Sequence, residues 1–168
     1  CRGSIDTANY QFQISGSNIV SPSGPLGWLL DLTGASESTL IAEADFGYYP
    51  NLELNKGIPY ASTGNYELPT KKIAGAVVFG SLTWPNIFGT RAALMPDLAV
   101  SQGITGLPAT ALPGFIEGAG SATLGFNVDF KVKPATTMRV DYTQNWGGGA
   151  SNLVRDRDFM SISVTTAF

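Results

Sequence analysis

Apolar and polar residues alternate along most of the chain, and the pattern is clearest in its last third. From 124 to 132 the even positions carry Leu, Phe, Val, Phe and Val, whereas the odd positions from 125 carry Gly, Asn, Asp and Lys. The segments 39–49, 137–146 and 160–168 repeat this alternation. A period of two is typical of β-strands whose two faces meet different surroundings.

Helical spacing of apolar residues is nearly absent, so the pattern predicts an all-β chain. We expect about eight antiparallel strands, near 7–15, 26–33, 38–48, 72–84, 90–102, 118–132, 136–146 and 156–168. Pro96 makes 90–102 the least regular of these, because proline cannot donate to a ladder.

The connections between the predicted strands alternate in length. Those at 33–37, 85–89 and around Pro134 are short, whereas 50–70 and 103–117 are long. Outer-membrane barrels have short periplasmic turns and long outer loops, so both chain ends are expected on the periplasmic side. Aromatic residues at predicted strand ends, where rings favour the membrane interface, are Trp28, Tyr48, Trp84, Trp146 and Phe168.

A water-soluble β-sandwich would also explain the alternation, but it would explain neither the loop lengths nor the aromatic residues at strand ends. The predicted fold is therefore an antiparallel transmembrane β-barrel in a bacterial outer membrane. Backbone groups cannot remain unpaired in lipid, so such a sheet must close. Residues 1–168 form either a single barrel domain or the C-terminal segment of a larger barrel.

Composition excludes several kinds of chemistry. The chain has no histidine and one cysteine, so neither a Ser-His-Asp arrangement nor a zinc or copper site built on His and Cys is available. The net charge of −3 gives no reason to expect nucleic acid. We expect no enzyme activity, no catalytic residue, no metal site and no cofactor.

Charged residues recur on the polar side of the predicted strands. If that side lines a barrel lumen, Lys131 can pair with Asp141, or Asp129 with Arg139, depending on the register. Glu43 and Asp45 could serve as a carboxylate pair, but polar barrel interiors make a lumen network the better interpretation. The predicted lumen cluster comprises Asp129, Lys131, Arg139, Asp141, Glu43 and Asp45.

The loop at 103–117 carries an unusual number of apolar residues for a segment expected outside the cell. It either forms an exposed surface that binds hydrophobic small molecules or folds into the mouth of its own barrel, and the two interpretations are compatible. The candidate residues are Ile104, Leu107, Leu112, Phe115 and Ile116.

The final strand ends on an aromatic residue preceded by apolar residues at alternate positions. This pattern resembles the C-terminal signal that the barrel-assembly machinery reads in bacterial outer-membrane proteins. The matching residues are Met160, Ile162, Val164 and Phe168.

The closing segment NWGGGASNLVRDRDFMSISVTTAF resembles a family of large proteobacterial outer-membrane proteins known mainly as a domain of unknown function. The closing pattern of that family is matched here by Tyr142 with Thr143, by the glycines at 147–149, by Asn152 with Leu153, and by 156–159. Glu117, Gly118, Leu124 and Gly125 are similar to its Glu-Gly-x-x-x-x-x-Leu-Gly strand. Members are much longer, which implies that this chain is the C-terminal part of a bigger barrel.

The resemblance implies a link to growth on poorly soluble compounds such as alkanes and sterols. The first hypothesis is therefore an outer-membrane channel that passes hydrophobic small molecules into the periplasm, with membrane lipid and the assembly machinery as its other partners. The second is a structural anchor with a plugged lumen and partner-binding outer loops. A wide lumen with an apolar or mixed lining would favour transport.

Overall fold

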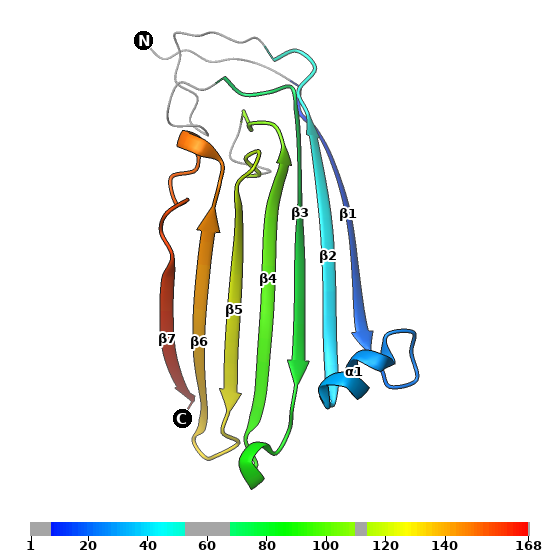
Figure 1. Ribbon diagram of the computed structural model, residues 1–168, viewed down its shortest axis with the longest axis vertical. Coiled ribbons are helices and arrows are strands. Elements are labelled where there is room, and N and C mark those ends of the chain that lie inside the picture. Colours follow the sequence, from blue (N-terminus) through cyan, green and yellow to red (C-terminus); the bar gives the residue numbers. More distant parts are fainter. Residues whose placement is uncertain (1–7, 53–67, 110–113, 168) are drawn as a thin grey trace.

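The computed structural model describes residues 8–52, 68–109 and 114–167. Seven strands form one antiparallel sheet in sequence order, so that each strand pairs with the next along the chain (Figure 1). The strands are β1 (Tyr10–Val20), β2 (Glu37–Tyr48), β3 (Lys72–Thr83), β4 (Ala93–Thr105), β5 (Gly120–Asp129), β6 (Ala135–Trp146) and β7 (Phe159–Ala167). Within these residues the sheet is not closed, because β1 and β7 each have one neighbouring strand.

The cross-strand register gives the sheet two faces of different chemistry. Partners are both even-numbered or both odd-numbered across all seven strands, as in Phe126 opposite Val140 and Gly125 opposite Asp141. A single exception follows Gly103, where a bulge shifts the register of β4. We call the two sides the even face and the odd face. Large apolar residues on the even face include Phe12, Ile14, Leu40, Val78, Leu98, Leu124, Phe126, Val140, Ile162 and Val164.

The segment predicted as a strand at 26–33 is a helix, so that prediction was wrong. Helix α1 (Gly27–Thr33) lies in the connection between β1 and β2. It ends at Gly34, which adopts a left-handed conformation with φ of 67° and donates its N–H to the Leu30 carbonyl. Leu30 is buried beside Val20 and Ala35, and Leu82 and Trp84 pack against this cluster. The helix therefore packs against one end of the even face.

The seven strands also change the predicted topology. β1 begins at the end of the sheet opposite to that at which β7 finishes (Figure 1), whereas the loop lengths predicted that the first strand begins and the last strand finishes on one side; the chain ends themselves lie outside the described residues. The connections 49–71, 106–119 and 147–158 lie at one end, and 21–36, 84–92 and 130–134 at the other. The connection at 130–134 contains the tight turn around Pro134, as predicted. The connection at 21–36 lies at the same end but is long, because it contains α1.

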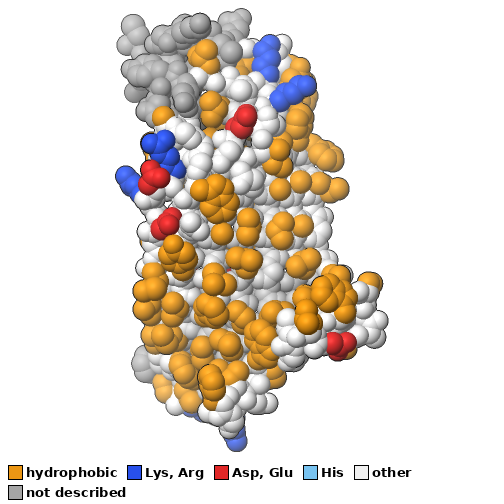
Figure 2. Space-filling model, in the orientation of Figure 1, with side chains coloured by type: hydrophobic (Ala, Val, Ile, Leu, Met, Phe, Trp, Pro, Cys, Tyr) orange, Lys and Arg blue, Asp and Glu red, His pale blue; other side chains and the backbone are white. Residues whose placement is uncertain are grey.

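Most large apolar side chains of the even face are not packed into a core. Six of the eight buried apolar residues described form two small clusters, one around Leu30 and one that contains Tyr49, Leu52 and Ile73. By contrast, Phe126 is 42% exposed and Val78 is 46% exposed. Figure 2 shows hydrophobic side chains spread over most of the visible face, with most of the charged groups in its upper half. The sheet thus presents a broad apolar surface to its surroundings.

Candidate functional site

An ion cluster joins three neighbouring strands on the odd face. Arg139 on β6 donates to Asp97 on β4, with Nη1 2.8 Å from Oδ2 and Nη2 3.0 Å from Oδ1. Its Nε also donates to Asp141 Oδ2 at 3.0 Å. The guanidinium reaches across β5 at Gly125, where an added Cβ would lie 2.5 Å from Arg139 Nη2. A glycine at this position therefore leaves the space in which two carboxylates share one arginine.

The pairing of charges differs from the sequence-based prediction. Lys131 pairs with Asp129, with 2.6 Å between Nζ and Oδ2, instead of with Asp141. Arg139 pairs with Asp97 and Asp141 instead of with Asp129. The physical reason is that β5 ends at Asp129, and Lys131 beyond it has a φ of 53°. Its side chain consequently returns to the end of its own strand.

Glu43 and Asp45 occupy the odd face of β2, as their spacing predicted. Glu43 lies opposite Val77 of β3, and Asp45 lies opposite Gly75. Strand β3 lies between them and Asp97 on β4, and three strands lie between them and Arg139 on β6, so the six predicted residues do not form one contiguous group. The odd face instead carries acidic residues in two separate places.

Apolar residues separate these two groups of charges. Ile41 on β2, Phe79 on β3 and Ala99 on β4 are successive cross-strand partners on the odd face. Val77 lies two residues before Phe79 on the same face. The odd face is therefore mixed in character, with an apolar row between carboxylates.

The connection between β4 and β5 folds back onto the odd face. Gly75 and Gly103 are direct cross-strand partners. A Cβ added to Gly75 would collide with the Phe115 ring, and one added to Gly103 would collide with the Ile116 carbonyl. Two facing glycines thus leave a gap that the loop fills. Hydrogen bonds from Glu117 N to Gly106 O (2.8 Å) and from Gly118 N to Gly103 O (3.0 Å) hold the returning segment.

The five apolar residues predicted for this loop do not form one patch. Phe115 and Ile116 lie against the odd face, so this part of the loop folds back onto its own sheet, whereas its place in the mouth of a barrel stays a prediction. Ile104 belongs to β4, because the strand continues to Thr105, and is 61% exposed. Leu107 is half-buried, and Leu112 lies outside the described residues.

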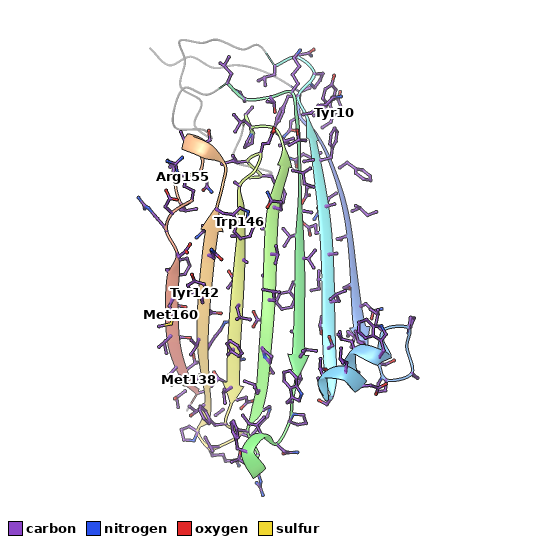
Figure 3. All side chains as sticks on the ribbon, viewed as in Figure 1. Tyr10, Met138, Tyr142, Trp146, Arg155 and Met160 are labelled. Carbon is purple, nitrogen blue, oxygen red and sulfur yellow. The ribbon has the colours of Figure 1, made fainter. Side chains whose placement is uncertain are left out.

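The last strand carries the predicted assembly residues in a regular alternation. Met160, Ile162 and Val164 lie opposite Tyr142, Val140 and Met138 on the even face, and Ile162 is 60% exposed. Figure 3 shows Met160 close to Tyr142 across β6 and β7. Phe168 lies outside the described residues.

Two interactions were not predicted from the sequence, one in the ion cluster of the odd face and one on the even face. Asp97 was missed because Pro96 obscured the alternation in its strand, although its odd position matches the polar side. Trp146 was correctly assigned to a strand end, but the contacts of its side chain with β5 and β4 were not predicted. Its ring covers Gly120 on β5, and Nε1 donates to Gln102 Oε1 on β4 at 3.1 Å. Figure 3 places Trp146 at the upper end of β6.

The fold and these contacts define a class of protein: an antiparallel β-sheet with one apolar exposed face and one face of mixed character that carries ion pairs. Residues 1–168 match the family described as protein of unknown function DUF1302, and the chain belongs to that family. No curated protein and no solved structure matches the chain.

Across 8–52, 68–109 and 114–167, no three His, Cys, Asp or Glu side chains are grouped so that they could hold a metal ion. In those same ranges no helix has both the length and the apolar character needed to cross a membrane.

Proposed function

We propose that this protein is an outer-membrane β-barrel channel that passes hydrophobic small molecules into the periplasm. The observation that carries the proposal is the even face, on which apolar side chains from all seven strands are exposed instead of packed into a core. Soluble monomers rarely expose apolar patches larger than a few hundred Å². Lipid is the surrounding in which such a face is stable, and the alternation of apolar outside with polar inside is that of outer-membrane barrels.

Membrane placement also sets a condition on the two edge strands. Backbone groups at a sheet edge cannot face hydrocarbon, so β1 and β7 need further partners. Both strands run in the same direction, because they are separated by five others in an antiparallel sheet. An antiparallel barrel therefore requires an odd number of additional strands between them. This requirement supports the expectation that the 168 residues form part of a larger barrel.

The odd face supports the choice of hydrophobic cargo. The apolar row of Ile41, Phe79 and Ala99 would give the lumen a surface on which an apolar molecule can be desolvated. The carboxylates of Glu43 and Asp97 flank this row and would keep the rest of the lumen hydrated. The family resemblance to proteins linked with alkanes and sterols adds the expected substrate class.

Uptake measurements on two variants of β3 test the proposal. Phe79→Asn places a polar amide in the apolar row, whereas Ser81→Asn puts the same amide two residues away, opposite Asp97. We expect Phe79→Asn to slow entry of a radiolabelled alkane or sterol into cells, and Ser81→Asn to leave it near the wild-type rate. Equal uptake by cells that lack the protein altogether would refute a transport role.

A structural anchor with a plugged lumen is the second candidate. Its support is the segment at Phe115 and Ile116, which fills the gap at Gly75 and Gly103 on the odd face. Conductance in planar lipid bilayers separates the two functions. A channel produces discrete conductance steps, whereas an anchor produces none even when the loop is displaced.

A further inference from the structure

Helix α1 carries apolar side chains that nothing in the described structure covers. Trp28 is 59% exposed and Leu32 is 75% exposed, and their spacing of four residues places them on the same side of the helix. Leu30 on the opposite side is buried against the end of the even face. Figure 2 shows hydrophobic side chains on the projecting segment at lower right, where Figure 1 draws α1. The helix is thus fixed to the sheet by one side and presents the other outward.

The end of the helix is held in place by a neighbouring tryptophan. Trp84 follows β3 directly, and its Nε1 donates to the Thr33 carbonyl at the last residue of α1, at 3.1 Å. Thr33 Oγ1 in turn donates to the Leu29 carbonyl at 2.7 Å. Because the C-terminal end of the helix is bonded to Trp84 and Leu30 is buried beside Val20, the exposed apolar side chains keep a defined height relative to the strands.

A groove runs from beneath α1 along the even face. Its volume is about 280 Å³, and its lining includes Leu29, Leu40, Gly80, Leu82, Leu98 and Leu124. Five leucines and Pro96 make most of this lining, and Ser38, Ser81 and Asp97 are its polar members. This volume is below the roughly 300–1,000 Å³ of pockets for drug-sized ligands, so it suits one extended alkyl chain better than a fused ring system.

We propose that α1 lies in the membrane interface and holds one acyl chain of a glycerophospholipid against the even face. This inference rests on the proposed function, because it needs the even face to meet lipid. The groove is continuous with that face, so its natural occupant there is a lipid chain. Trp28 has the amphipathic ring that is enriched at the interface, and an apolar helix surface at this depth avoids water.

Spin labels at three positions test the placement of the helix. Cys1, the one cysteine of the sequence, is replaced by serine, and a nitroxide is attached at Leu32→Cys, Val78→Cys or Ser15→Cys in the protein reconstituted into phosphatidylcholine vesicles. Val78 lies on the even face and Ser15 on the odd face. We expect the labels at Leu32 and Val78 to be accessible to oxygen and protected from a water-soluble nickel complex, with Leu32 at the shallower depth.

The three labels separate failure of this inference from failure of the proposed function. A lipid-exposed label at Val78 with a nickel-accessible label at Leu32 would refute the interfacial helix and leave the membrane barrel standing. Nickel access at both positions would refute the membrane sheet itself. Protection of Leu32 from both nickel and oxygen would mean that a protein surface covers the helix, which also contradicts the inference.

A second measurement tests the groove. Gly80 lines it, and a Cβ added there meets Leu40 Cδ1 at 3.6 Å, an ordinary contact, so Gly80→Phe should fold and fill the groove. Gly16→Phe is the matched control, because Gly16 lies on the even face outside this groove and has no atom within 4 Å of an added Cβ. We expect Gly80→Phe, but not Gly16→Phe, to lower the number of motionally restricted spin-labelled phospholipids per protein. Equal numbers in both variants would refute acyl-chain binding in the groove.

Discussion

Arginine at Val78 provides a direct test of which face of the sheet meets lipid. Val77 and Val78 are adjacent residues near the middle of β3, and their side chains point to opposite faces. Val78 lies between Ala42 and Val100 on the even face, whereas Val77 lies between Glu43 and Ser101 on the odd face. The substitutions Val78→Arg and Val77→Arg therefore make the same chemical change on the two sides of one strand.

The magnitude of the difference follows from depth in the bilayer. At about 3.3 Å per residue, Val78 lies about 20 Å along the strand from Lys72 and about 17 Å from Thr83. With a strand tilt of about 40°, both distances shorten to about 13–15 Å, which places Val78 near the midplane of an apolar band about 25 Å tall. Arginine facing lipid at that depth costs about 2–4 kcal/mol. This cost lowers the folding equilibrium constant by roughly 30-fold to 900-fold.

Val77→Arg should behave differently because Glu43 is its direct cross-strand partner. Opposite charges in that arrangement contribute about 0.2–1 kcal/mol, which offsets part of the lost valine packing. Urea unfolding in phospholipid vesicles, followed by tryptophan fluorescence, measures both free energies. Equal destabilisation by the two variants, or a larger loss for Val77→Arg, would refute the assignment of the even face to lipid.

Three further predictions concern the loop, the ion cluster and the orientation. Gly103→Val should displace the segment at Ile116 and raise conductance in planar bilayers, because its side chain collides with the Ile116 carbonyl; unchanged conductance would contradict a constricting loop. Double-mutant cycles in urea unfolding should give Arg139 with Asp97 a coupling of about 0.5–3 kcal/mol, and the exposed pair of Arg155 with Asp156 a coupling near zero; equal couplings would count against a shared cluster. In intact cells, cysteine at Arg155 should react with an impermeant maleimide and cysteine at Ala135 should not; the reverse result would invert the proposed orientation.

The strands could be predicted from sequence because alternation reports the two faces directly. Every strand from β2 onward was located to within a few residues at each end, and the regular apolar positions of β5 and β6 appear on one face. Helix α1 was missed because Leu26, Trp28, Leu30 and Leu32 occupy even positions and so imitate a strand. Two turns of helix are too short for periodicity alone to identify. Gly34 was the available signal, because glycine is favoured directly after a helix.

The candidate site was less predictable because pairing depends on where strands end. The charges of Asp129, Arg139 and Asp141 were correctly placed on one side by their parity. Their partners required two facts that alternation does not contain: the end of β5 before Lys131, and the register that brings Asp97 opposite Gly125. Phe115 lies against Gly75, which is far from it in the sequence. No local pattern of residues could therefore reveal this contact.

The constant parity of the register has a consequence for how this protein can change in evolution. Adding or deleting one residue within a strand would exchange the two faces for the rest of that strand, and would place carboxylates where lipid is proposed to lie. Insertions and deletions of odd length should therefore be confined to the connections. The bulge after Gly103 follows this rule, because it lies two residues before the end of β4 and affects little of the sheet. Length variation among relatives of this chain should then cluster at 49–71, 106–119 and 147–158, while the strands change mainly by substitution.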